Sequence, residues 1–129
     1  MLELTFFYLT SAILGIMVFF SFVVAPVTFT TLDEENARKF IRRIFPFYYN
    51  VNLALSSLAA ALYVIFKSYH INFYLILSVS ILFAVSNYIL MPLINKYRDQ
   101  KKDKHFKYSH FLSVLINFVQ ILLVLIILF

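Results

Sequence analysis

The sequence closes with the segment KYSHFLSVLINFVQILLVLIILF, residues 107–129. Nearly all of it is apolar, and as a helix it is long enough to cross the roughly 30 Å hydrocarbon core of a bilayer, so it predicts a transmembrane span. Four polar side chains interrupt this span: His110, Ser113, Asn117 and Gln120. Polar groups are costly in hydrocarbon unless a partner answers them, so this side of the helix is expected to face protein, water or a ligand.

The rest of the chain belongs to the same class of protein. Hydrophobic residues make up 63% of its 129 residues. Three further apolar stretches, near residues 4–29, 48–66 and 71–94, are each long enough to span a bilayer. Glu3 stands where a secretory signal would carry basic residues, so the first stretch is expected to be a retained helix. We therefore expect an all-α polytopic membrane protein, with residues 1–129 forming one integral domain, a bundle of four transmembrane helices.

The basic residues predict the orientation of these helices. Ten of the 11 Lys and Arg residues lie in the first and third loops or at the start of the last span, and only Lys67 lies in the second loop. By the positive-inside rule, loops one and three lie in the cytoplasm and both termini lie outside the bacterial inner membrane. The net charge of +5 does not indicate nucleic-acid binding, because no aromatic residues interleave the basic run.

The first loop carries a helical pattern of its own, in TLDEENARKFIRRIFPFYY, residues 31–49. Apolar residues recur at helical spacing between basic ones, and Asp33 or Thr31 is suited to cap the start. This predicts a short amphipathic helix lying in the membrane interface between spans one and two. Pro46 favours an extended Phe45 and a turn into the second span, with the aromatic cluster Phe45, Phe47, Tyr48 and Tyr49 in an interfacial belt.

Spans one and three resemble each other. SFVVAPV, residues 21–27, parallels NYILMPL, residues 87–93, with a proline near the same end of each helix. Two helical hairpins derived from one duplication would produce this pattern, and chance similarity between apolar segments is the alternative. Small residues, including Gly15 in span one and Ala60 in span two, predict faces where helices pack closely.

The polar residues of the spans provide the candidate site. His110, Ser113, Asn117 and Gln120 fall within one narrow sector of the fourth helix, and Asn50 and Asn87 offer partners from the second and third. One interpretation is that these residues join helices by hydrogen bonds; the other is that they line a site for a ligand, ion or cofactor.

The composition gives little support for proton transfer, metal binding or catalysis. No Asp or Glu lies within the interior of a predicted span, which argues against a proton relay built on an intramembrane carboxylate. The absence of cysteine excludes disulfides and thiolate metal sites. No set of residues for nucleophilic catalysis is evident, and we expect no metal site and no catalytic residues.

The segments LGIMVFFSFVVAPVTFTTL, RIFPFYY, PLINKYRD and HFLSVLINFVQILL resemble the membrane proteins grouped as domain of unknown function 4149, which are related to eukaryotic transmembrane protein 205. The resemblance implies a four-helix membrane bundle. It implies, more distantly, a likeness to copper-resistance D-like bundles, some of which bind haem, although the histidine-rich first helix of those relatives is absent here. The matching motif positions are Phe45, Pro46, Tyr49, Asn95, Asp99, His110, Ser113 and Asn117.

Two classes of function follow from these observations. The first is a membrane bundle that binds a small ligand in a polar interior near the cytoplasmic face, takes part in transport, or serves as an assembly component or homo-oligomer in the lipid bilayer. The second is a haem- or metal-binding oxidoreductase-like protein using His110. The ligand-binding candidates are His110, Ser113, Asn117, Asn50, Asn87 and Tyr49.

Overall fold

Four long helical rods make up the computed structural model, which describes all 129 residues. The first rod is α1 (Leu2–Phe19), the π-helical segment η1 (Phe20–Val24) and α2 (Ala25–Thr31), and the second is α3 (Glu34–Ile65). The third is α4 (Ile71–Val85), the π-helical segment η2 (Ser86–Leu90) and α5 (Met91–Asp99), and the fourth is α6 (Asp103–Leu128). Each rod is long and apolar enough to cross a membrane, so the expected all-helical architecture with four such helices is confirmed.

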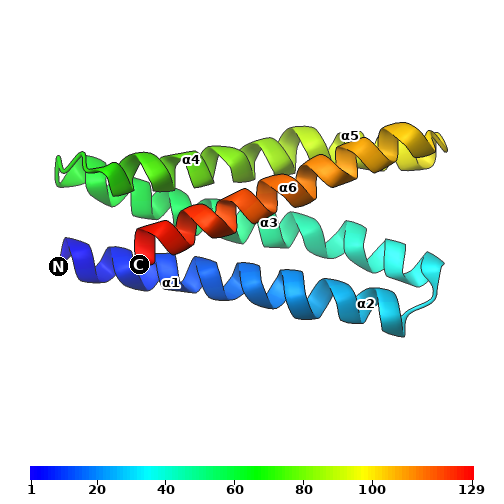
Figure 1. The fold of residues 1–129 in the computed structure, drawn as a ribbon, viewed down its shortest axis with the longest axis horizontal. Helices are drawn as coiled ribbons and strands as arrows, with labels where there is room; N and C mark the ends of the chain where they lie inside the picture. The colour runs from blue at the N-terminus through cyan, green and yellow to red at the C-terminus, as the bar shows by residue number, and fades with distance from the viewer.

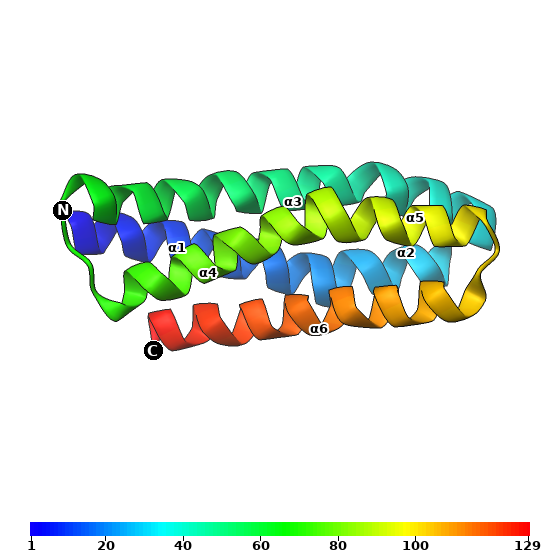
Figure 2. The same ribbon diagram turned by 90° about the horizontal axis from the view of Figure 1, so that it is seen from above.

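The rods run up and down along one axis (Figure 1). Both chain termini and the turn after α3 lie at one end, which we call the termini end. The α2–α3 and α5–α6 turns lie at the other, which we call the charged end (Figure 2). The α1 rod packs on α3 and α6, and the α4 rod packs on the same two helices, so the four rods form a square bundle.

The first and third rods share an irregularity. Both π-helical segments are five residues long, and each ends two residues before a proline, Pro26 or Pro92. Proline has no N–H and its ring clashes with the carbonyl one turn earlier, and the wider π turn relieves this clash without ending the helix. The similarity seen in the sequence therefore extends to the backbone, because the two prolines are accommodated in the same way.

The turns at the rod ends are fixed by specific groups. The Asp33 carboxylate accepts a hydrogen bond from the Asn36 N–H at 3.4 Å and so caps α3. After α3 and α5 the chain reverses through Lys67 and Lys101, whose φ values are 51° and 55°. In each turn the N–H of the following residue bonds to a carbonyl five residues back, at 2.9 and 3.0 Å, which closes the helix end.

The separate amphipathic helix expected between spans one and two is not confirmed. Residues 34–47 form the first turns of α3, which continues without a break into the apolar part of the rod. The expected extended conformation of Phe45 is wrong, because Pro46 lies inside the helix and Phe45 is helical. The preference of a residue before proline for extended backbone is only moderate, and the packing of Phe45 on Phe20 and Tyr49 favours the continuous helix.

The core is apolar along most of its length and is bounded by exposed hydrophobic side chains. Ile13, Met17 and Phe83 are completely buried, whereas large side chains such as Phe22 and Ile126 lie on the outside. Exposed apolar side chains of this kind are typical of a helix bundle that is surrounded by lipid. Ala60 is buried as expected, but the expectation for Gly15 is wrong, since a Cβ there would meet no atom within 4 Å.

Candidate functional site

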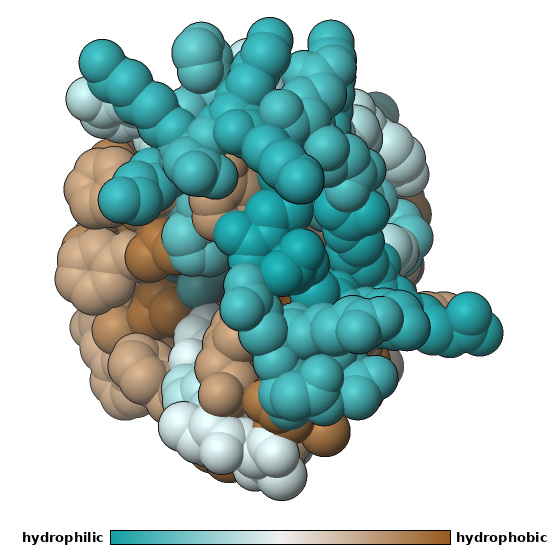
Figure 3. All heavy atoms as spheres, turned by 90° about the vertical axis from the view of Figure 1, so that its right-hand side faces the viewer, coloured by the Kyte–Doolittle hydropathy of each residue, from teal (hydrophilic) through white to brown (hydrophobic).

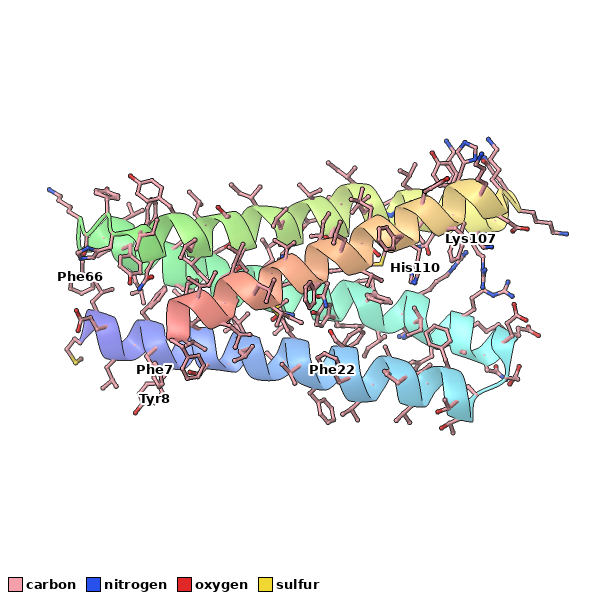
Figure 4. All side chains as sticks on the ribbon, viewed as in Figure 1. Phe7, Tyr8, Phe22, Phe66, Lys107 and His110 are labelled. Atoms are coloured by element: carbon pink, nitrogen blue, oxygen red, sulfur yellow. The ribbon has the colours of Figure 1, made fainter.

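The polar stripe of the fourth helix does not face one common environment. Gln120 is completely buried, Asn117 and Ser113 are partly buried, and His110 lies largely exposed near the charged end. The helices diverge toward that end, where α6 packs on α5 and α2 packs on α3. Residues that share a helical sector therefore pass from the core to the surface along the helix. Figure 4 labels His110 on α6, near the charged end.

Asn117 joins three rods. The Tyr48 hydroxyl donates to Asn117 Oδ1 at 2.7 Å, and Asn117 Nδ2 donates to Ser21 Oγ at 2.9 Å. Tyr48 is buried and stacks on Phe20, with ring centroids 4.2 Å apart. Tyr48 thus faces the inside of the bundle, and the membrane depth expected for it stays a prediction. Its hydroxyl group can lie in the core because Asn117 supplies the partner that a buried phenol needs.

Asn50 and Asn87 form a second link between rods. Asn87 Nδ2 donates to Asn50 Oδ1 at 2.9 Å. Asn87 and Ser21 occupy the second position of η2 and η1, respectively, and each bonds to an asparagine of a neighbouring rod. Rods one and two form a first hairpin, and rods three and four form a second. Exchanging the two hairpins would interchange the two links.

Two amide groups in the core are only half satisfied. Gln120 Nε2 donates to the Val79 carbonyl at 3.0 Å, and Asn52 Nδ2 donates to the Tyr48 carbonyl at 2.9 Å. The oxygen of each side-chain amide is buried without a partner. A buried acceptor without a partner costs free energy, so each of these two oxygens lowers the stability of the folded bundle. Asn52 lies outside the candidate set because nothing in its sequence neighbourhood distinguishes it.

His110, Ser113 and Tyr49 make local contacts. The His110 ring lies parallel to Phe106, at 7° and 5.7 Å between centroids, and the Arg98 guanidinium lies 4.5 Å from the Phe106 centroid. The Ser113 hydroxyl donates to the His110 carbonyl of its own helix at 2.7 Å. Tyr49 is buried and stacks on Phe45. The six candidate residues are thus spread over separate contacts, and their role in ligand binding stays a prediction.

A cavity that the sequence did not indicate, widely open to solvent, lies at the charged end. It has a volume of about 450 Å³ and is lined by Glu35, Arg38, Lys39 and Arg42 of α3 and by Asp99 of α5. All five lining side chains are charged. Figure 3 views this end face, where hydrophilic residues form a broad area that borders apolar ones. We call this feature the charged cavity.

Arg42 fixes the geometry of the charged cavity. Its Nη2 donates to Asp99 Oδ1 at 2.5 Å and its Nη1 to Asp99 Oδ2 at 3.3 Å, so the pair is bidentate. Arg42 Nη2 also donates to the Asn95 carbonyl at 3.4 Å. The hydrogen bond from Arg42 lowers the pKa of the Asp99 carboxyl, which keeps this group ionised. Asn95 and Asp99 are motif positions of the resemblance, and the structure brings both to Arg42.

The other two cations of the cavity are held loosely. Arg38 pairs with Glu34 at 2.8 Å and Lys39 with Glu35 at 3.1 Å, both one turn apart on α3. The two glutamate side chains are 78% and 77% exposed. Exposed pairs with this spacing contribute only about 0.3–0.5 kcal/mol each, so another anion can replace the glutamates at little cost.

The histidines do not form a site that fits haem or a metal. Nowhere in the chain do three or more His, Cys, Asp or Glu side chains come together in an arrangement that could hold a metal ion. His105 packs against Tyr97, and His110 covers Phe106 at the surface. A haem ligand would need an enclosing apolar pocket, whereas His110 lies exposed.

Comparison with known proteins gives one match. Residues 8–103 match the profile of a family described as "Domain of unknown function (DUF4149)". The matched range includes most of the first three rods and therefore Arg42, Asn95 and Asp99. No curated protein and no solved structure matches the chain, so the more distant likeness to copper-resistance D-like bundles is not shown.

Proposed function

We propose that this chain, which belongs to the DUF4149 family, is an integral membrane protein whose charged cavity binds a phosphate-bearing amphiphile. The observation that carries the proposal is a cavity lined by three basic and two acidic side chains at the end of an apolar bundle, with the acidic Asp99 held by Arg42. A ligand with an anionic head and an apolar tail would place its head in the cavity and its tail along the exposed hydrophobic surface of the rods. The polar side chains inside the bundle hold the rods together.

The contacts within the cavity favour a phosphomonoester as the head group. Arg42 is committed to Asp99, which leaves Arg38 and Lys39 available once their exposed glutamate partners move aside. A phosphomonoester carries a charge of about −1.5 to −2 near neutral pH and three strong acceptor oxygens, so it can engage both cations together. A phosphodiester has one charge, and we expect it to bind more weakly.

The distribution of charge supports a cytoplasmic location for this end. The excess of Lys and Arg at the charged end is the pattern of loops retained in the cytoplasm. In this orientation both termini lie outside the inner membrane, and the ligand comes from the cytoplasmic leaflet, whose anionic lipids attract basic segments. The haem- or metal-binding alternative with His110 has no specific contact in its favour.

Native mass spectrometry of the detergent-purified protein tests this proposal, with dioleoyl phosphatidic acid as the phosphomonoester and dioleoyl phosphatidylglycerol as the phosphodiester. We expect the double variant Arg38→Gln/Lys39→Gln to bind phosphatidic acid at least tenfold more weakly than the unmodified protein. The matched control Lys101→Gln/Lys102→Gln removes the same charge at the same end outside the cavity, and its affinity should change less than twofold. Equal losses in the two variants would show a general charge effect and would refute the site.

A further inference from the structure

A second cavity lies at the termini end of the bundle and shares no lining residue with the charged cavity. It has a volume of about 460 Å³, within the range of small-molecule sites. The start of α1, the turn after α3, the start of α4 and the end of α6 surround it. Figure 4 shows this end at the left, with Phe7 of α1 and Phe66 of the turn labelled.

Three rings form one wall of this cavity. Tyr63 meets Phe6 at 4.7 Å between centroids and 81° between planes, and it meets His70 at 6.4 Å and 82°. Phe6, Tyr63 and His70 all line the cavity. Phe6 and Tyr63 are each only 4% exposed, so a ligand in the cavity reaches a part of each ring, and the negative face of an aromatic ring attracts a cation.

A carboxylate completes the surroundings. Glu3 lines the cavity and lies three residues before Phe6, so the two side chains share one face of α1. Glu3 takes part in none of the four salt bridges of the protein. Its negative charge is therefore available to a ligand. The other polar lining groups, Ser68 and Asn72, are uncharged.

We propose that this cavity binds an alkylated ammonium cation. The combination of perpendicular aromatic rings with one carboxylate is suited to quaternary and methylated ammonium groups, which are attracted by ring faces and keep an apolar surface. Leu2, Ile127 and Leu128 add apolar walls against which the substituents of such a cation pack. Both a soluble amine and the ammonium head group of a membrane lipid have this chemistry.

The test uses the full chain in nanodiscs made of phosphatidylglycerol alone, a lipid without an ammonium group. Choline is titrated and its binding is followed by NMR line broadening and by nuclear Overhauser effects between its methyl groups and aromatic rings. We expect saturable binding with Overhauser effects to Tyr63 and Phe6, and at least fivefold weaker binding of the neutral isostere 3,3-dimethyl-1-butanol. Equal binding of the two compounds would overturn the proposal.

Variants locate the site. Glu3→Gln should weaken choline binding at least fivefold, while the matched control Glu34→Gln, a surface carboxylate at the other end, should leave it unchanged. Glu3 is exposed, so this variant is expected to fold. Tyr63→Leu should abolish the Overhauser effects, whereas Tyr69→Leu, in the turn after α3 but outside the cavity, should preserve them. Unchanged affinity in Glu3→Gln would contradict the proposal.

Nanodiscs of phosphatidylcholine separate the two sources of the ligand. If the lipid head group occupies the cavity, the apparent affinity for free choline falls in these nanodiscs, and the fall disappears in Glu3→Gln. If the site selects a soluble amine, the affinity for choline is the same in both lipids. Each result supports the ammonium site, and each assigns it a different source of ligand.

Discussion

Replacing Asn117 by leucine should destabilise the bundle chiefly through the partner that it leaves behind. The substitution removes two hydrogen bonds between rods, to Tyr48 at 2.7 Å and to Ser21 at 2.9 Å. Such bonds in membrane proteins contribute about 0.6 kcal/mol each, or about 1.2 kcal/mol together. The Tyr48 hydroxyl then loses its acceptor in the core, with only the Ser21 side chain within reach, which adds about 1–3 kcal/mol. We expect a total loss of about 2–4 kcal/mol in the free energy of unfolding.

A double-mutant cycle isolates this effect. Tyr48→Phe removes the hydroxyl and keeps the ring stacked on Phe20, so the double variant with Asn117→Leu should lose less stability than the sum of the two single variants. We expect a coupling energy of about 2–3 kcal/mol, measured by reversible unfolding in mixed micelles with increasing dodecyl sulfate. A coupling energy near zero would refute the proposed link. A fully stable Asn117→Leu protein would show that this residue does not hold the rods together.

Three further predictions concern other elements. Lys101→Gly should raise the free energy of unfolding by about 0.5–1 kcal/mol in the same unfolding assay, because only glycine adopts φ near 55° without strain; a loss of stability would contradict the turn geometry. In thermal unfolding, Gly15→Leu should leave the midpoint nearly unchanged and Ala59→Leu, at a completely buried position, should lower it; equal shifts would contradict the assigned faces. Asp99 lies beyond the expected span 71–94, and the hydrogen bond from Arg42 lowers its pKa below the usual 3.8. The pair therefore contributes its full stability above pH 3.8 and loses it as the pH falls through the lowered pKa. Asp99→Asn should remove this acid dependence of the unfolding free energy, and an unchanged pH profile would count against the pair.

The sequence predicts the number and extent of the rods because each is a long apolar segment bounded by charged or turn residues. The Asp33 cap is also predictable, since a carboxylate three residues before an N–H has a recognised local geometry. The prolines of the first and third rods are visible in the sequence as well. The π turns before them are not, because a proline can also be accommodated by a simple kink.

The partners of the polar residues could not be predicted from helical periodicity alone. Periodicity places His110 and Gln120 on one side of α6, but their burial depends on how the rods diverge toward the charged end. Tyr48 follows Pro46, which suggested a break in the chain at the membrane surface, and the continuous α3 instead carries Tyr48 into the core. Gly15 lies on the outer surface, which the sequence cannot show because a small residue suits an outward position as well as a helix contact.

The charged cavity could not be predicted from the sequence either. Arg42 and Asp99 are far apart in the sequence, and each alone looks like an ordinary charge that fixes the topology of a membrane protein. Their pairing depends on the unbroken length of α3 beyond the apolar segment, which brings the long Arg42 side chain within reach of Asp99 in α5. A separate interfacial helix would have moved Arg38 and Lys39 away from Asp99 and removed the cavity.

The distance between the phosphorus of a bound phosphomonoester and the Arg38 guanidinium tests the proposed function most directly. Solid-state NMR can measure ³¹P–¹⁵N dephasing on arginine-labelled protein in membranes that contain phosphatidic acid. We expect dephasing that corresponds to a direct hydrogen-bonded contact in the unmodified protein, and the loss of this contribution in Arg38→Gln with the Lys101→Gln/Lys102→Gln control unaffected. Dephasing that is the same in Arg38→Gln as in the unmodified protein, or absent from both, would contradict binding in the charged cavity.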